Sequence, residues 1–292
     1  METINIGYYF VAFIDVVGQR DKLKQLVSLP KNESEKRKMG EILSETSEYI
    51  KELRKQYGDY FSSAQQPTGL LDSRSPEQVA WLEERKKSII WRKGFSDSYV
   101  ITVPCWHESR FGVHIGSIYE CLYGLCALQL WALVMEKPFR GAVEVDLAVE
   151  VDNEEVYGPV LVRAYEMESE HAGYPRIIVG QGLLNHLESV QKRCKDDRDS
   201  KHTLINIDNC RGLVTTDFDE RYILDYIGEG VKSVQTDLPV SAMVSEAYDF
   251  TIQQQRQFLD EDNQKLYGYY SHLRDYIESR LSLWDIPVQP KE

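Results

Sequence analysis

The run from Ile4 to Val17 constrains the fold more than any other stretch of this chain. It is dense in aromatic and β-branched residues, short for a helix, and closed by Gly18. This pattern predicts a strand buried on both faces, which requires covering layers on both sides. A single carboxylate, Asp15, stands near the end of this otherwise apolar run. A charged group is costly to bury, so a partner or a ligand is expected there.

The elements downstream follow from apolar periodicity, capping residues and turn residues. Their order is the βαββαβ pattern of a ferredoxin-like α+β sandwich with additions. That pattern places the first strand beside the hairpin that follows, so Asp15 and Asp97 are expected to converge. The predicted elements are helices over 19–29, 33–57 and 75–87, a hairpin of 89–93 and 99–103 with Asp97 in its tip, a helix over 110–136, a strand over 139–151, a helix over 156–173, a strand over 175–180, a polar loop over 194–201, a late strand within 219–228 and helical structure over 240–283.

Charge and apolar run length exclude two classes of partner. Asp and Glu outnumber Lys and Arg by 47 to 34, for a formal net charge of -13, and a field of this sign repels nucleic acid and anionic lipid. The longest nearly apolar run, 121–135, is shorter than the roughly 20 residues of a membrane span. Five cysteines without a CxxC pair suit reduced thiols. We expect a soluble cytoplasmic protein that binds neither nucleic acid nor membrane.

Several motifs between residues 9 and 180 carry a family resemblance. FIDVVG surrounds Asp15, KGFSDSYVI surrounds Asp97, and RGAV is followed by YGPVLVRAYEMES and YPRIIV. With its motifs in this order, the chain resembles the class III nucleotide cyclases. Among them it resembles the bacterial pyrimidine (uridylate and cytidylate) cyclases of Pycsar anti-phage systems. The resemblance implies a lyase that converts UTP or CTP to cyclic UMP or cyclic CMP and pyrophosphate as an antiviral defence signal. It also implies a homodimer, since cyclase sites of this type form between two subunits.

The same resemblance implies a metal site. In that family two divalent ions, magnesium or manganese, bridge the triphosphate and two aspartates, so Asp15 and Asp97 would be ligands together with the carbonyl of Val16. Hard oxygen ligands suit these ions, and the ions stabilise both the attacking and the departing oxygen. The backbone around Gly18, at a loop that opens a helix, would cradle phosphate. From FIDVVG alone, a helix cap or an ion pair is the alternative for Asp15.

The chain departs from the family on the helix after the fourth strand. Cyclases that act on purines carry an Asn and, four residues later, an Arg, where this chain has Val162 and Glu166. Arg163 lies one turn before Glu166 and either reaches the phosphates as the catalytic residue or pairs with Glu166 on the helix surface. Asp146 stands where related chains tend to have glycine. It either adds an acid near the metals or faces solvent.

Three further basic residues have two interpretations each. Lys93, four residues before Asp97, either contacts the base or is a solvated edge residue. Arg140 and Arg176 begin strands and either contact phosphate or pair with acids. We take Gly18, Lys93 and Arg140 as the substrate-binding candidates. The sequence GQG at 180–182 follows a strand but lacks the full dinucleotide fingerprint.

These residues predict one α+β domain with a ferredoxin-like, cyclase-like core. The core covers residues 1–235 with a helical insertion at 18–88, and a helical extension covers 236–292. The alternative function is a catalytically inactive nucleotide sensor or dimeric interaction module, because Val162 and Glu166 replace the expected donors. A third possibility keeps the metals and uses them for another phosphoryl reaction.

Overall fold

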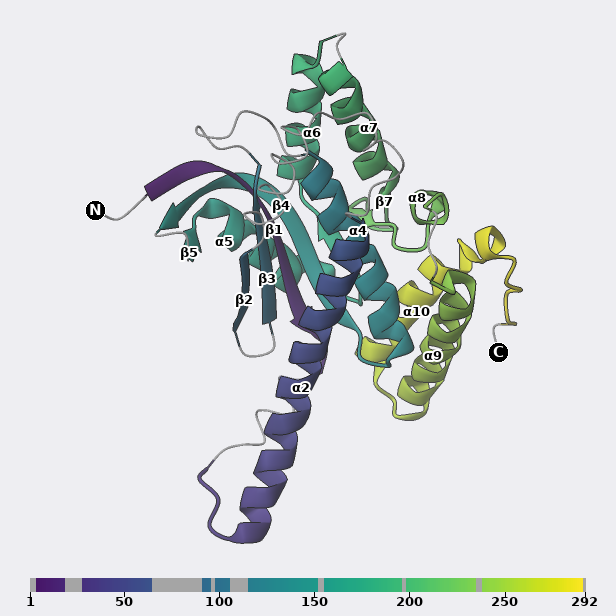
Figure 1. Ribbon diagram of the computed structural model, residues 1–292. Coiled ribbons are helices and arrows are strands. Elements are labelled where there is room, and N and C mark those ends of the chain that lie inside the picture. Colours follow the sequence, from purple (N-terminus) through teal and green to yellow (C-terminus); the bar gives the residue numbers. More distant parts are fainter. Residues whose placement is uncertain are drawn as a thin grey trace.

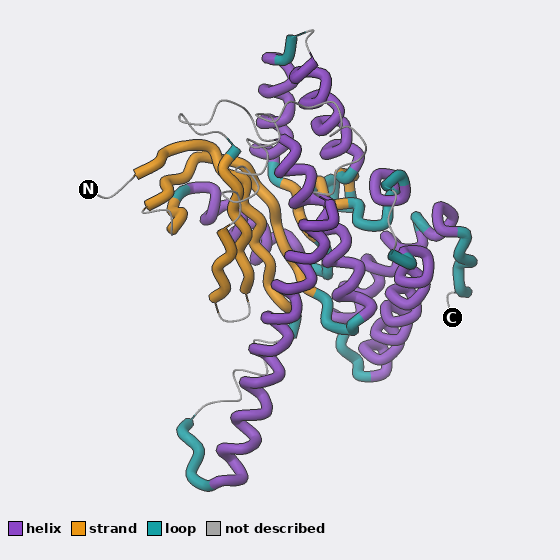
Figure 2. The backbone as a smooth tube through the Cα atoms, viewed as in Figure 1, coloured by secondary structure: helices purple, strands orange, loops and turns teal. Residues whose placement is uncertain are grey.

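The computed structural model is a mixed α+β molecule with helices on both sides of one sheet (Figure 1). In the described part of the chain the sheet has eight strands in the order β2-β3-β1-β4-β6-β8-β7, with β5 paired to β4. The strands form one twisted layer (Figure 2). The structure describes residues 4–18, 28–64, 91–95, 98–105, 115–151, 155–195, 198–234 and 238–290.

The first strand, β1 (Ile4–Val16), lies at the centre of the predicted βαββαβ core. It is antiparallel to both β3 (Ser98–Pro104) and β4 (Phe139–Val151), and β2 (Trp91–Phe95) pairs with β3. The order β2-β3-β1-β4, with helices in the two long connections, is the ferredoxin-like arrangement. The predicted fold class is therefore confirmed.

Alternate residues of β1 enter two different cores, which explains its continuous apolar sequence. Phe10 and Ala12 belong to the main core under the long helices, whereas Tyr9 and Val11 belong to a smaller core on the opposite face. Because strand side chains point alternately to the two faces, Asp15 lies on the face of the smaller core.

The long helices α2 (Glu33–Ala64) and α4 (Ile115–Val134) cover the face of the main core. The second half of α2 packs on α4 through Tyr49, Leu53 and Tyr57. Its first half projects from the body of the molecule (Figure 1). Within the described residues α4 alone is long and apolar enough to cross a membrane by length and composition, and most of its apolar stretch is buried inside the fold.

The helix predicted over 156–173 begins later than expected. Its first residues form β5 (Glu155–Tyr157), which pairs with the end of β4. The helix itself is α5 (Pro159–Glu166), continued by a π-helical segment, η2 (Met167–Ala172). Val160 and Ala164 of α5 complete the smaller core.

The later strands extend the sheet beyond β4. β6 (Ile177–Val179) is parallel to β4, and β8 (Tyr222–Leu224) is antiparallel to β6. β7 (Val214–Thr216) forms a hairpin with β8 at the edge. The predicted late strand is confirmed, although it is shorter than the sequence pattern.

The C-terminal part is helical as predicted, with a break at Asp262, whose φ is 53°. The break is followed by an N-cap in which the Asn263 side chain accepts a hydrogen bond from the Leu266 N–H at 3.2 Å. The predicted polar loop over 194–201 is wrong at its end, because α7 begins at Arg198. The region predicted to be helical contains α9 (Val240–Asp260), α10 (Gln264–Glu278) and the short 3₁₀ helix η3 (Leu281–Trp284). Three helices before it were not predicted: α6 (Gln181–Arg193), α7 (Arg198–Gly212) and α8 (Glu229–Lys232).

Polar contacts join the C-terminal helices to the sheet. The Asp225 carboxylate accepts hydrogen bonds from Tyr276 at 2.9 Å and from Arg280 Nε at 3.0 Å. The indole of Trp284 donates to the carbonyl of Ile227 at 2.8 Å. Side chains of α9 and α10 share one apolar core with the sheet.

Some predicted elements cannot be compared. Residues 19–27 and 65–90, the hairpin tip at 96–97 and residues 106–114 lie outside the described residues. Residues 28 and 29, the end of the helix predicted over 19–29, are not helical.

Candidate functional site

Asp15 occupies the end of β1 between two neighbouring strands. It is in register with Ser98 of β3 and with Arg140 of β4. The Ser98 hydroxyl donates to Asp15 Oδ1 at 3.2 Å, and Arg140 Nη2 lies 3.6 Å from Oδ2. The side chains of Asp15 and Arg140 are each 25% exposed. The carboxylate is therefore held on both sides while part of it still faces solvent.

Arg140 has a second and closer acid, Glu168 on η2. Arg140 Nη2 lies 2.9 Å from Glu168 Oε1, and the Glu168 side chain is only 3% exposed. Arg140 Nε is buried and has no hydrogen-bond partner among the described residues. Of the two interpretations of Arg140, the structure contains the pairing with acids.

The π-helical segment sets the position of Glu168. Arg176 holds this segment in place, because its Nε and Nη2 donate to the carbonyls of Ala172 and His171, each at 2.8 Å. The same guanidinium also binds Asp217 and Asp219. A π-helical turn at such a place is a common feature of functional sites. Arg176, like Arg140, pairs with acids.

Arg163 lies far from Asp15 within one chain. Its partner is Asp146 of β4, with which it forms a close ion pair, rather than Glu166 on its own helix. Asp146 is six residues beyond Arg140 on β4 (146 minus 140), which is about 20 Å along a strand. Arg163 is 58% exposed, so its outer side faces solvent. Asp146 neither joins Asp15 nor simply faces water.

The remaining predicted site residues are placed in part. Gly18 follows β1 with φ of +84°, a left-handed conformation that favours glycine. Lys93 lies in β2 in register with Val100, which is itself in register with Phe13 of β1. Asp97 lies outside the described residues, so its predicted convergence with Asp15 stays a prediction.

The donors near Asp15 fit a hard cation. The carboxylate offers oxygen ligands at a rigid strand end, and a bound ion would replace the guanidinium that stands beside one of its oxygens. Across the described ranges no group of three or more His, Cys, Asp or Glu side chains is gathered as a ready-made metal cage. A divalent ion at Asp15 would therefore need ligands from Asp97, from backbone or from the nucleotide itself.

Sequence analysis missed a buried acid, Glu144, which explains the GQG turn. Its carboxylate accepts hydrogen bonds from the N–H groups of Val145 at 2.8 Å and Leu183 at 3.0 Å. A Cβ on Gly180 or Gly182 would stand 2.3 or 2.5 Å from a Glu144 oxygen. Burial raises the pKa of Glu144, and the two N–H groups oppose this shift. The turn therefore holds an internal carboxylate where a dinucleotide-binding turn would hold phosphate.

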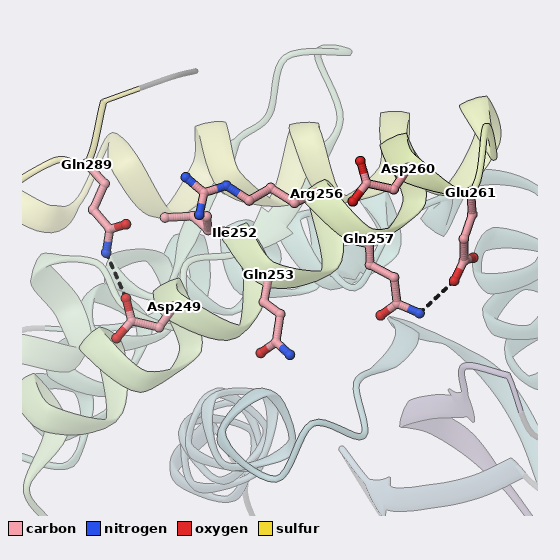
Figure 3. Close-up of a pocket in the computed structure, with 8 residues that line it drawn as sticks. All are labelled: Asp249, Ile252, Gln253, Arg256, Gln257, Asp260, Glu261 and Gln289. Atoms are coloured by element: carbon pink, nitrogen blue, oxygen red, sulfur yellow. Dashed lines mark hydrogen bonds between the residues drawn. The ribbon is translucent and has the colours of Figure 1, made fainter.

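A surface hollow of about 610 Å³ lies along α9 (Figure 3). Gln257 donates to Glu261 at 2.8 Å, and Gln289 donates to Asp249 at 2.8 Å. Apart from Gln289, its lining residues all lie on α9 or directly after it. The hollow is the outer face of one helix and brings no catalytic groups together.

No family model and no curated protein matches this sequence. The chain is similar to the adenylyl cyclase CyaB from P. aeruginosa, with 11% identity and a TM-score of 0.37 over 64% of this chain and 84% of that one. It is also similar to the catalytic core of a rhodopsin-guanylyl cyclase with converted specificity in complex with ATPalphaS, with 9% identity, a TM-score of 0.36 and the same two coverages, 64% and 84%.

A third similar structure is a Class III adenylyl cyclase-like ATP-binding protein from Pseudomonas aeruginosa. It has 11% identity and a TM-score of 0.36 over 96% of this chain and 45% of that one. The fold assignment of this chain rests on its own strand order.

Proposed function

We propose that this protein is a metal-dependent nucleotide cyclase. It would convert a pyrimidine nucleoside triphosphate, UTP or CTP, into the 3′,5′-cyclic monophosphate and pyrophosphate. The observation that carries the proposal is the position of the Asp15 carboxylate. It is held at a strand end by the Ser98 hydroxyl and lies beside the Arg140 guanidinium. The choice of a pyrimidine and a role as a cytoplasmic anti-phage signal rest on the sequence motifs around Asp15, Asp97 and Arg163.

The reaction needs a proton to leave and charge to be balanced. The ribose 3′-oxygen would lose its proton to water and bond to the α-phosphorus, while the bond from that phosphorus to the oxygen it shares with the β-phosphate breaks and pyrophosphate leaves. Two bound Mg²⁺ or Mn²⁺ ions would supply stabilisation of the attacking and the leaving oxygen. Asp15, the carbonyl of Val16 and Asp97 would hold these ions.

The other candidates would bind the nucleotide. Arg140 would face the phosphates, and Gly18 would let the backbone approach them closely. Lys93 would contact the base.

The position of Arg163 supports the proposed homodimer. Because Arg163 is separated from Asp15 by about 20 Å along the sheet, it can serve a site only if a second copy of the chain brings it there. On the same helix, Val162 and Tyr165 are 55% and 54% exposed, and Tyr165 packs edge-on against Phe13 of β1. This exposed apolar surface on α5 supports pairing of two copies.

An inactive nucleotide sensor is the second candidate. Two observations favour it: Arg140 stands beside the predicted metal ligand, and Val162 offers no donor on the exposed face of α5. Such a protein would bind nucleotide and return it unchanged.

The test is incubation of the purified protein with each of the four ribonucleoside triphosphates and Mn²⁺, followed by mass spectrometry. We expect a cyclic monophosphate from UTP or CTP, and no product from the Asp15→Ala or Asp97→Ala variants with folding retained. Asp208→Asn is the matched control, because this acid is 73% exposed on α7 and remote from the site. Bound nucleotide without any product would favour the sensor.

A further inference from the structure

The two acids of Arg140 are unequal, and this inequality suggests what the arginine does. Glu168 lies 2.9 Å from Nη2 and is almost fully buried. Asp15 lies 3.6 Å from the same nitrogen, which is a longer ion-pair distance, and it is partly exposed. Glu168 is therefore the anchor of Arg140, and Asp15 is the looser partner.

Burial makes the anchor durable. A carboxylate that is removed from water needs a partner, and breaking a buried ion pair costs far more than loosening an exposed one. Glu168 also sits on a π-helical segment that Arg176 fixes through two backbone carbonyls. If Asp15 acquires another cation, Arg140 can lose that contact and keep Glu168.

The guanidinium of Arg140 keeps donors to spare. Nη2 makes both contacts with acids, and Nε has no hydrogen-bond partner within the described part of the chain. An arginine has five N–H donors in a planar fork that matches phosphate oxygens. Arg140 therefore combines a fixed anchor with unused donors beside Asp15.

We propose that Glu168 is a positioning residue that holds Arg140 as a replaceable counter-ion for Asp15. Without ligand, Arg140 neutralises Asp15. When a divalent ion binds Asp15, Arg140 stays on Glu168 and turns its free donors to a phosphate oxygen of the nucleotide. This inference rests on the proposed function, because it takes Asp15 as a metal ligand.

Two substitutions at residues in contact, Arg140 and Glu168, should change the affinity for Mn²⁺ in opposite directions. Electron paramagnetic resonance in the absence of nucleotide measures this affinity. Arg140→Gln removes a competing cation, so Mn²⁺ alone should bind about tenfold tighter, a change of about 1.4 kcal/mol. Glu168→Gln leaves the charge of Arg140 balanced by Asp15 alone, so Mn²⁺ should bind about tenfold more weakly. Arg37→Gln, a change at an 84% exposed arginine of α2, should have no effect.

A second measurement uses inorganic triphosphate together with Mn²⁺, which avoids any assumption about the base. Arg140→Gln should weaken triphosphate binding about tenfold even though it strengthens the binding of Mn²⁺ alone. The double variant Arg140→Met with Glu168→Leu removes both charges, so no buried charge is left alone. It should bind Mn²⁺ as tightly as Arg140→Gln does, which keeps the test valid if Glu168→Gln fails to fold.

The Asp15→Asn variant separates the two levels of the claim. If it loses Mn²⁺ binding but the Arg140 and Glu168 variants shift affinity in the same direction or not at all, the inference is wrong and the metal site stands. If Asp15→Asn binds Mn²⁺ like the unmodified protein, the proposed metal site itself is wrong, and the inference falls with it.

Discussion

Arg140 and Arg176 directly precede Gly141 of β4 and Ile177 of β6, the first register pair of these parallel strands, yet their surroundings differ. Arg176 is 4% exposed, and its three nitrogens donate to two carboxylates and two backbone carbonyls. Arg140 is 25% exposed and makes its contacts with acids through one nitrogen. A fully bonded arginine has nothing left for a ligand and can only stabilise the fold. An incompletely bonded arginine beside a strand-end acid is suited to binding.

The largest expected difference between the two arginines is in how much their removal lowers the free energy of unfolding. We expect Arg176→Met to lower the free energy of unfolding by about 3–5 kcal/mol, because it leaves Asp217 and Asp219 without their buried partner. Arg140→Met should cost less, about 2–3 kcal/mol, because it removes a partner from one buried acid, Glu168, rather than from two acids and two backbone carbonyls. Urea denaturation of both variants measures the difference, and equal losses would remove the distinction between the two arginines.

The two glycine turns near these strands extend the comparison. Gly182→Ala should cost about 2–4 kcal/mol, because its Cβ would stand 2.3 Å from the carbonyl oxygen of Val145 and 2.5 Å from Glu144. Gly18→Ala should cost about 1 kcal/mol, since a Cβ there meets no atom within 4 Å and only the positive φ is unfavourable. Thermal unfolding of the two variants shows which substitution costs more stability. A larger loss for Gly18→Ala would mean that the turn after β1 is more tightly packed than the structure indicates.

Much of the fold was predictable because its signals are local. The continuous apolar run of β1, the alternation in β4, the hairpin and the apolar helix α4 all lie within single segments of sequence. The helix α7 was not predicted, and its first turn, at Arg198, is polar like the loop before it. The break at Asp262 carried a usable signal, the capping residue Asn263.

The site was predictable only in outline. Asp15 at a strand end could be read from FIDVVG, but its pairing with Arg140 depends on strand register. The contact between Arg140 and Glu168 joins residues 28 positions apart (168 minus 140). It depends on a π-helical turn that no sequence pattern predicted. The pairing of Arg163 with Asp146 likewise needed the placement of α5 over β4.

Lowering the pH should reduce the stability that the ion pairs of Arg176 with Asp217 and Asp219 provide. Burial raises the pKa of Asp219, but the hydrogen bonds and charge of Arg176, together with Arg221, outweigh it and lower the pKa to about 2. In the unfolded chain this pKa is about 3.9. As the pH falls from about 4 to 2 the unfolded state therefore binds more protons, and about 1–2 kcal/mol of stability is lost after allowance for solvent screening.

Denaturation at several pH values between 2.5 and 5 checks this prediction. Asp219→Asn should flatten the fall in stability over that window. An unchanged slope in the variant would mean that Asp219 does not carry the effect.

The smallest effect expected at the site concerns Asp15. Asp15→Asn should change stability by less than about 1 kcal/mol, because the side chain is partly exposed and the amide can still accept from Ser98. Urea denaturation measures this change. A loss as large as that of Arg176→Met would make Asp15 a structural residue.

Hydrogen exchange measured by mass spectrometry tests most directly whether ligand enters at Arg140 and not at Arg176. The protein would be compared with and without Mn²⁺ and inorganic triphosphate. We predict slower exchange at the end of β1 and the starts of β3 and β4, with no change in the β7–β8 hairpin beside Arg176. Protection confined to that hairpin or to α9, with none around Asp15, would contradict the account.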